Sequence, residues 1–419
     1  MNGDDKMSRK NLKQLFHMNI AEYKAEYNRR FNSDDTIHLP LYIGENQAFI
    51  CQTPEIYKMI VNIERLDKAI SQIELPTAAE KQYVNRCLID EIILTNNIEG
   101  VHSTRKEIAD ILQDLHTKNK KKRFVGLVAK YKKLAEAEKI PLNSCEDIRR
   151  IYDDIFYEEI EATDPENLPD GEIFRKSGVE VHSPAQKVLH KGLYPESKII
   201  DAFQKSLEIL NDETIDFLIR TAVFHYLFGY IHPFYDGNGR TSRFISSYLL
   251  SQNLNPLIAF RLSYTIKENI KKYYDAFDVC NNPLNKGELT PFVEMFIGIV
   301  ESSMKQLLES LEEKRRELNV YEVFVKVFLK NEKDLARLYY VLIQATLFTN
   351  IGISRDELIS HMECSGNTLK KMLDSIPQEL LLVNQRKNKK FYLLNLDEVN
   401  KRIEKSFNEN SHLDITPIK

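Results

Sequence analysis

The residues best suited to chemistry lie close together, from His232 to Arg243, in the stretch His-Pro-Phe-Tyr-Asp-Gly-Asn-Gly-Arg-Thr-Ser-Arg. His232 can take up a proton near neutral pH. Asp236 offers the hard oxygen that Mg²⁺ prefers when it binds a nucleotide phosphate. Arg240 and Arg243 lie one helical turn apart, so both can point at one anion, and a guanidinium group binds two phosphate oxygens at once. A base, a metal ligand and an anion site in one segment indicate phosphoryl or nucleotidyl transfer.

This segment must connect two helices. Upstream, between positions 213 and 231, apolar residues recur at the spacing of one buried helix face. These residues are Ile215, Leu218, Ile219, Ala222 and Leu227. Downstream, residues 244–250 are again apolar and helical. Gly237 and Gly239 let the backbone turn where a Cβ atom would clash, and backbone N–H groups at the start of the second helix attract an anion. The sequence therefore predicts a tight helix–loop–helix connection that holds a phosphate group.

The segment matches a known family signature at every fixed position. It resembles the signature of the Fic (filamentation induced by cyclic AMP) domain, H-x-F-x-[D/E]-G-N-G-R-x-x-R. The resemblance covers roughly residues 90 to 303. It implies a protein adenylyltransferase, which transfers AMP from ATP to a hydroxyl of a target protein while pyrophosphate leaves. The target would present a Tyr, Thr or Ser hydroxyl, and the protein itself is one candidate.

The resemblance also assigns roles to single residues. The ATP site would comprise the turn and the following helix start: Asp236, Gly237, Asn238, Gly239, Arg240, Thr241, Ser242 and Arg243. His232 would take the proton from the incoming hydroxyl, and Asp236 would hold Mg²⁺ between the phosphates. Asn238 and the glycine amides would bind the α- and β-phosphate region, and the two arginines the outer phosphates. Tyr273 and Asn281, on a helix predicted over 267–281, would lie beside the base or ribose.

A second predicted helix, over 78–98, ends in Thr95-Asn-Asn-Ile-Glu99-Gly100. The helix dipole disfavours a carboxylate at a helix C-terminus, so Glu99 needs a partner. The segment is similar to the inhibitory helix of Fic proteins, which ends [S/T]-x-x-x-E-[G/N]. The resemblance implies that Glu99 competes with the ATP γ-phosphate for Arg243 and so inhibits transfer.

A short hairpin is predicted ahead of the signature, because apolar and polar residues alternate there. In Fic proteins a hairpin at this position, called the flap, aligns the target chain as an added strand. We assign Val179, Glu180, Val181 and His182 to this flap.

Composition limits the remaining possibilities. The chain has 419 residues, 42% hydrophobic and 29% charged, which is typical of a soluble protein of two or three domains. The net charge of −4 gives no overall attraction to nucleic acid. The five cysteines are scattered and lack C-x-x-C pairs, so we expect a reducing compartment and neither a disulfide frame nor a zinc site. No apolar signal or membrane-spanning run occurs, so we expect a cytoplasmic protein with no membrane partner.

The C-terminal region predicts a separate small domain. A capping box at Ser354 begins one helix, Thr368 begins a second, and two apolar strands then flank a basic segment. This order resembles a winged helix. The basic residues available to DNA phosphates are Lys370, Lys371, Arg386, Lys387, Lys389 and Lys390. Such domains also pack or dimerise, so DNA binding and a homodimer both stay open.

We therefore expect a mostly α-helical protein. Residues 1–120 would form an N-terminal helical region carrying the inhibitory helix, 121–303 the Fic core with its short β-hairpin flap, 304–320 a spacer helix and 321–419 the winged helix. Two other functions stay open. On the same site Glu99 would orient a water that removes AMP from a modified protein, or the chain would be a DNA-binding regulator whose Fic core senses nucleotide. Phosphate transfer of the Doc type is disfavoured, because that subgroup departs from the Asp-Gly-Asn-Gly pattern.

Overall fold

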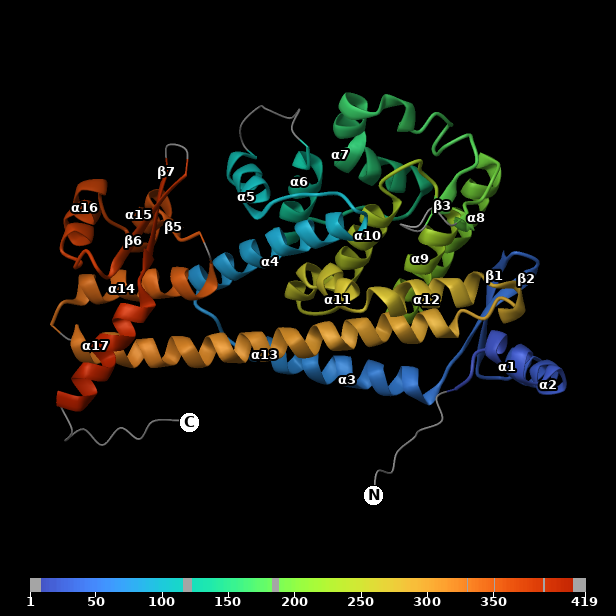
Figure 1. Cartoon of the computed structure of the whole chain (residues 1–419), viewed down its shortest axis with the longest axis horizontal. Helices are drawn as coiled ribbons and strands as arrows, with labels where there is room; N and C mark the ends of the chain where they lie inside the picture. The colour runs from blue at the N-terminus through green and yellow to red at the C-terminus, as the bar shows by residue number, and fades with distance from the viewer. Residues whose placement is uncertain are drawn as a thin grey trace, which may run out of the picture. The chain divides into compact units, whose positions relative to one another are not determined.

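The computed structural model describes residues 9–115, 123–182, 188–329, 331–349, 351–386 and 389–409. The chain is mostly helical, as the sequence predicted, and the strands of these residues form three small sheets (Figure 1). It divides into two compact units: residues 1–69 with 88–307, and residues 70–87 with 308–419. Within the described residues, no helix combines the length and the apolar composition that a bilayer crossing needs.

The first unit begins with a helix pair and a hairpin: α1 (Leu12–Met18), α2 (Ile20–Phe31), β1 (Thr36–Ile43) and β2 (Asn46–Cys51). Five helices follow: α3 (Pro54–Ser71), α4 (Thr77–Ile98), α5 (Arg105–Asp114), α6 (Val125–Ala135) and α7 (Cys145–Thr163). A second hairpin, β3 (Glu180–His182) and β4 (Val188–Lys191), precedes α8 (Glu196–Asn211), α9 (Phe217–Ile231), α10 (Asn238–Asn253), α11 (Leu262–Glu268), α12 (Ile270–Asn281) and α13 (Thr290–Phe328). Short 3₁₀ turns are η1 (Pro165–Asn167), η2 (Pro256–Phe260) and η3 (Pro283–Asn285).

Helix α9 forms the centre of the first unit and is buried on all sides, with α8 and α10 packed against it. A helix that is apolar all round belongs in a protein core rather than at a surface. The sequence predicted this helix from position 213, but it begins at Phe217. The reason is local: Asp216 accepts the Leu218 N–H at 2.8 Å as an N-cap, and Asp212 holds Thr214 in a turn before it.

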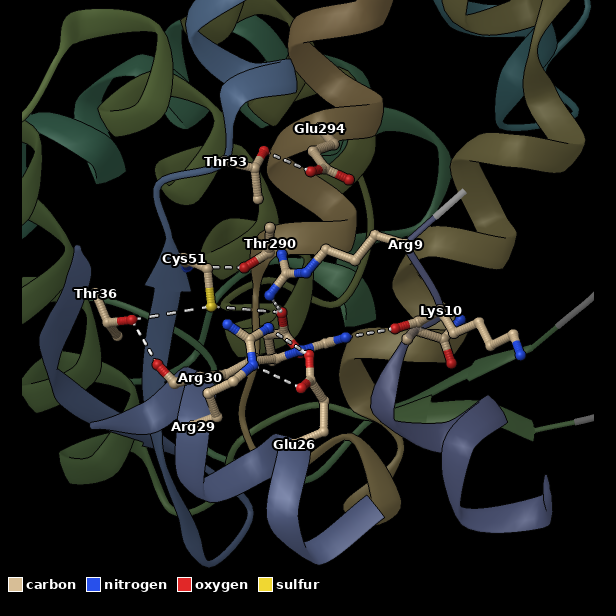
Figure 2. A network of polar contacts seen from close by, with 12 residues as sticks. Arg9, Lys10, Glu26, Arg29, Arg30, Thr36, Cys51, Thr53, Thr290 and Glu294 are labelled. Atoms are coloured by element: carbon tan, nitrogen blue, oxygen red, sulfur yellow. Dashed lines mark hydrogen bonds and ion pairs between the residues drawn. The ribbon is translucent and has the colours of Figure 1, made fainter. Parts of the chain in front are cut away.

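A buried polar network joins the N-terminal helices to the rest of the first unit, and its arginines converge in Figure 2. Glu288, just before α13, is fully buried and lies 2.9 Å from Arg30 and 2.9 Å from Arg9. Arg30 also pairs with Glu26 at 2.7 Å. A buried carboxylate left without such partners would cost several kcal/mol. The N-terminal segment and the start of α13 therefore depend on each other.

Two helix predictions need revision. The helix expected over 267–281 is present as α12, but it begins at Ile270. Positions 267 and 268 end α11, and Asn269, whose side chain donates to the Thr265 carbonyl at 3.0 Å, separates the two helices. The expected spacer over 304–320 is not a separate element, because α13 continues without a break from Thr290 to Phe328. The division between the units falls inside α3, α4 and α13. Periodicity in the sequence cannot mark a boundary that lies within a continuous helix.

The second unit contains α14 (Lys333–Phe348), β5 (Ile353–Ser354), α15 (Arg355–Met362), α16 (Gly366–Asp374), β6 (Leu381–Arg386), β7 (Lys389–Leu394) and α17 (Leu396–Glu409). Strand β7 lies between β5 and β6 and is antiparallel to both. The expected capping box is present, with the Glu357 N–H donating to Ser354 Oγ. Tyr83, from the first half of α4, packs edge-on against Phe348. The predicted Lys387 lies outside the described residues.

Candidate functional site

The predicted connection between two helices is present at the end of α9. His232 is the C-cap that follows Ile231, the last residue of α9, and it has a left-handed backbone (φ 53°); α10 begins after Gly237, which is also left-handed (φ 80°). A Cβ atom at Gly237 would lie 3.0 Å from the ring of Phe156 on α7. Glycine therefore meets two needs at this point, the backbone conformation and close packing against α7.

Asn238 braces the turn from inside. Its Oδ1 accepts the Phe234 N–H at 3.0 Å, and its Nδ2 donates to the Phe234 carbonyl at 2.8 Å. The Phe234 ring is fully buried and stacks on Tyr152 at a centroid distance of 3.7 Å. Since its side chain is engaged by the protein, Asn238 has its backbone N–H left for a phosphate.

Arg243 is buried (1% exposed) and is held by the end of α4. Its Nη2 donates to Glu99 Oε1 at 2.7 Å and to the Thr95 carbonyl at 3.0 Å, and its Nε donates to Thr95 Oγ1 at 2.8 Å. Burial acts to lower the pKa of Arg243, but the Glu99 carboxylate outweighs it and the pKa is raised. A side chain at Gly239 would clash with that carboxylate. The pairing of Glu99 with Arg243 that the sequence suggested is therefore present.

Arg240 is equally buried but points to α7. Its guanidinium lies 4.5 Å from the centre of the Phe156 ring, 3.2 Å from Asp236 Oδ2 and 3.9 Å from Glu159 Oε1. Among the described residues, its Nε and Nη1 have no hydrogen-bond acceptor. The guanidinium groups of Arg240 and Arg243 thus contact different helices, whereas their spacing had suggested one direction. Buried donors without acceptors are rare and suit a site that an anion fills.

The imidazole of His232 is neutral at pH 7. Burial, followed by the nearby His190 and Arg175, lowers the pKa of His232 to about 4. Arg175 is fully buried, and its Nε donates to the His232 carbonyl at 2.9 Å while its Nη2 donates to the Leu193 carbonyl at 2.8 Å. Arg175 was not predicted, since nothing in the sequence distinguishes it from a surface arginine in a polar loop.

The predicted hairpin beside the signature is confirmed. β3 and β4 are antiparallel, with Val181 opposite His190. His190 Nε2 lies 2.6 Å from the Tyr230 carbonyl on α9, and its ring stacks on Tyr230. At the base of the hairpin, the Gly192 N–H donates to the Val179 carbonyl at 3.1 Å. The hairpin that carries Val179, Glu180, Val181 and His182 is therefore fixed next to His232, and its role as a flap stays a prediction.

Two predicted site residues, Thr241 and Ser242, contact the protein interior. Thr241 Oγ1 donates to the Gly237 carbonyl at 2.8 Å. Ser242 Oγ lies 3.2 Å from Nδ1 of the buried His225, whose pKa is lowered to about 3 by burial and by Arg243. Both side chains therefore stabilise the start of α10 through contacts on its buried face.

The two predicted base or ribose residues separate in space. Tyr273 is buried, and its hydroxyl lies 2.8 Å from His225 Nε2. Arg243 is close enough to act on its pKa, which burial raises. Asn281 instead accepts a hydrogen bond from the Tyr226 hydroxyl on α9 at 2.8 Å. Tyr273 thus packs with His225 near Arg243, whereas Asn281 contacts α9.

The predicted metal ligand, Asp236, is mostly exposed and contacts Arg240. Its side chain is 56% exposed, and its Oδ1 accepts the Gly237 N–H at 2.6 Å. In the part of the chain that the structure describes, no group of three His, Cys, Asp or Glu side chains is placed to hold a metal ion. This fits Mg²⁺, which takes one or two carboxylates and completes its shell with phosphates and water.

Comparisons with known proteins agree with the signature. Residues 142–250 match the Fic/DOC family. Over 126 residues the chain is 29% identical to protein adenylyltransferase fic-1 of Caenorhabditis elegans, covering 27% of this chain and 23% of that protein. Over 83 residues it is 36% identical to protein adenylyltransferase Fic of Aedes aegypti, covering 20% and 15%. The chain thus spans less than a quarter of the length of these relatives. The solved structure of a Fic family protein from Desulfovibrio desulfuricans G20 aligns with 82% of this chain and 96% of that one, at 19% identity and a TM-score of 0.47.

Proposed function

This chain carries a domain of the Fic/DOC family, and on that premise we propose that it is a protein adenylyltransferase. It transfers AMP from ATP to a Tyr, Thr or Ser hydroxyl of a target protein. The names of the matched relatives support the activity and the class of target. The free thiols of the cysteines support work in a reducing compartment such as the cytoplasm.

The observation that carries the proposal is the state of the Arg240 guanidinium at the start of α10. Among the residues that the structure describes, two donors of Arg240 have no acceptor; they lie beside the N-terminus of α10, where backbone N–H groups and the helix dipole also attract an anion. Phosphate groups fit both features, and the neutral His232 lies at the other end of the same loop.

In the proposed reaction, the oxygen of the target hydroxyl bonds to the α-phosphorus of ATP. The bond from that phosphorus to the bridging oxygen of the β-phosphate breaks, and pyrophosphate leaves. The hydroxyl proton passes to His232, whose pKa rises when phosphate anions bind nearby. Arg175 fixes the backbone of His232 through its carbonyl, so the base keeps its place. Catalysis of this kind consists mainly of positioning and charge neutralisation.

Asp236 would hold Mg²⁺ in this scheme, because its carboxylate is exposed at the mouth of the turn. The ion would neutralise phosphate charge. Arg240 contacts the same carboxylate and would orient it toward the phosphates.

Glu99 would inhibit the reaction by occupying Arg243. Their ion pair of 2.7 Å removes one cation from the site, so the outer phosphates of ATP bind elsewhere and the α-phosphate is misaligned. The Glu99 side chain is also 32% exposed, so it can reach a water that would remove AMP from a modified protein. Transfer is the main proposal, and removal is its alternative at the same residues.

The test is incubation of the protein with α-labelled ATP and Mg²⁺, alone and with lysate proteins. We expect label on protein side chains, and we expect His232→Ala to lower labelling by about 10²–10⁴-fold, the usual effect of losing a general base. His17→Ala, an exposed histidine on α1, is the matched control and should label like the unaltered chain. Transfer by His232→Ala within about tenfold of the unaltered chain would exclude the proposed base.

A second candidate function is DNA binding by the second unit. Its order of α14, β5, α15, α16, β6 and β7 suits a winged helix. Lys370 and Lys371 of α16 are exposed, as are Lys389 and Lys390 of β7. We expect the whole chain to bind duplex DNA, with an affinity that falls steeply with salt and with alanine at these four lysines. Alanine at Lys271 and Lys272, two exposed lysines of α12, is the control; no binding at low salt removes this candidate.

A further inference from the structure

Glu91 is a buried carboxyl group on α4, the helix that Glu99 directly follows. It lies two turns earlier on α4, and its exposed fraction is 0%. Both of its oxygens accept the Ser263 N–H at 3.0 Å, at the start of α11. A carboxyl group buried to this degree is uncommon and needs a physical reason.

The position of Thr95 places Glu91 close to Arg243. Thr95 lies midway between Glu91 and Glu99 and binds Arg243 through its hydroxyl and its carbonyl. Side chains four residues apart on a helix are neighbours, with Cβ atoms roughly 5–6 Å apart. Glu91 and Glu99 therefore lie one turn before and one turn after the residue that holds the guanidinium, and the charge of Arg243 acts on the ionisation of Glu91.

The charges around Glu91 make its ionisation sensitive to events at Arg243. It faces Arg243 from α10, Arg261 from the segment before α11, and the Tyr131 hydroxyl from α6. Burial raises the pKa of Glu91 to about 7, against the opposing pull of the two arginines. When Glu99 neutralises Arg243, Glu91 gains little by ionising. When Arg243 loses Glu99, its buried charge favours the ionised form of Glu91.

We propose that Glu91 is a second acidic partner of Arg243, and that its ionisation weakens the binding of the outer nucleotide phosphates. The inference rests on the proposed function, because it takes Arg243 as the group that binds these phosphates. Arg243 then has three alternative anionic partners: Glu99 in the resting protein, Glu91 when neither Glu99 nor phosphate pairs with it, and phosphate in the complex. Binding of a nucleoside triphosphate thus becomes linked to uptake of a proton by Glu91.

The test compares ATP dissociation constants of Glu99→Gly and of Glu99→Gly with Glu91→Gln, from about pH 6 to about pH 8.5 with Mg²⁺. The ratio of the two constants cancels the titration of ATP itself. We expect a ratio near one at low pH that rises to about tenfold at high pH, as one added carboxylate near the arginine would produce. AMP lacks the outer phosphates, so its ratio should stay near one. Glu80→Gln, an exposed acid on the same helix, should give a ratio near one throughout.

A second measurement leaves position 91 unaltered. Calorimetry of ATP binding to Glu99→Gly near neutral pH, in two buffers of different ionisation enthalpy, should show proton uptake, and AMP should show none. A flat ATP ratio or the absence of proton uptake overturns the role of Glu91 while leaving the proposed transfer intact. Lack of transfer despite ATP binding contradicts the proposed function alone. Lack of ATP binding contradicts both.

Discussion

The two buried arginines of the turn, Arg240 and Arg243, have different partners. On the α7 side, Arg240 stacks on Phe156, and two of its nitrogens find no acceptor among the described residues. On the α4 side, Arg243 makes three hydrogen bonds, two to Thr95 and one to Glu99. Both guanidinium groups are almost completely buried, so the difference comes from their partners and not from their exposure. In the proposed anion site, the Arg240 half would therefore bind phosphate directly, whereas Glu99 occupies the Arg243 half.

The position of the acids explains this difference. The carboxylate nearest Arg240 belongs to Asp236, which is mostly exposed, and Glu159 is 3.9 Å away. Glu99 is brought to 2.7 Å from Arg243 by the end of α4 and faces Gly239, where a Cβ atom would exclude it. Under the proposed function, Glu99 would therefore control the site through Arg243 alone, and Arg240 would stay available to phosphate.

The largest expected effect is that of Glu99→Gly. Freeing Arg243 should realign the nucleotide, and an error of about 1 Å in such reactions costs roughly 10²-fold, so transfer should rise by about that factor. The measurement is labelling with α-labelled ATP at saturation, and addition of Arg243→Ala should cancel the gain. Asn97→Gly, at an exposed position in the last turn of α4, controls for a loosened helix end. Equal labelling with and without Glu99→Gly would show that the α4 side does not inhibit.

The next effect separates the two arginines in the unaltered chain. Arg240→Ala should weaken ATP binding about thirtyfold, the value of a charged hydrogen bond. Arg243→Ala should change ATP affinity little, because Glu99 already occupies that arginine. Isothermal calorimetry with Mg²⁺ measures both. Equal losses for the two variants would break the comparison, since each arginine would then bind phosphate in the resting protein.

The sequence predicted the Arg240 side of the turn better than the Arg243 side. The turn, its glycines and the helices around it follow from local patterns: apolar periodicity, glycine where φ is positive, and the signature itself. The partner of Glu99 was suggested by a second local motif. Arg175 and Glu91 left no local signal, because their importance comes from burial against segments far away in the chain. The divergence of Arg240 and Arg243 also depends on which helix packs on each side, and a helical spacing does not contain that information.

The α4 side holds a further carboxyl group, Glu91, and its removal should change stability with pH. The pKa of Glu91 is raised from 4.5 to about 7 in the folded protein, so its protonated form is the stable one there. Its contribution is fully present below about pH 4.5 and is lost as the pH rises through about 7. Glu91→Gln should therefore raise the melting temperature by a few degrees at about pH 8 and leave it unchanged near pH 4.5. An increase of equal size at both values would exclude titration of Glu91 as the cause.

The smallest expected effect tests the stacking on the α7 side. Phe156→Leu removes the cation–π contact with Arg240, worth about 1 kcal/mol, so ATP affinity should fall about fivefold. Tyr157→Leu, at the exposed neighbouring position, should leave affinity unchanged. Because Phe156 also packs on Gly237, the melting temperature is measured alongside. Unchanged affinity in Phe156→Leu would mean that this ring does not help to place Arg240.

The network around Glu288 has a consequence for the order of folding. Arg30 and Glu288 are 258 positions apart, so a ribosome exposes Arg30 and its local partner Glu26 long before Glu288 exists. Contacts of such long sequence separation carry a loop-closure cost before they bring any stabilisation, and they form late. During synthesis Arg30 therefore remains hydrated while the intervening helices assemble. The arrival of Glu288 at the start of α13 then joins the earliest residues of this unit to its last helix.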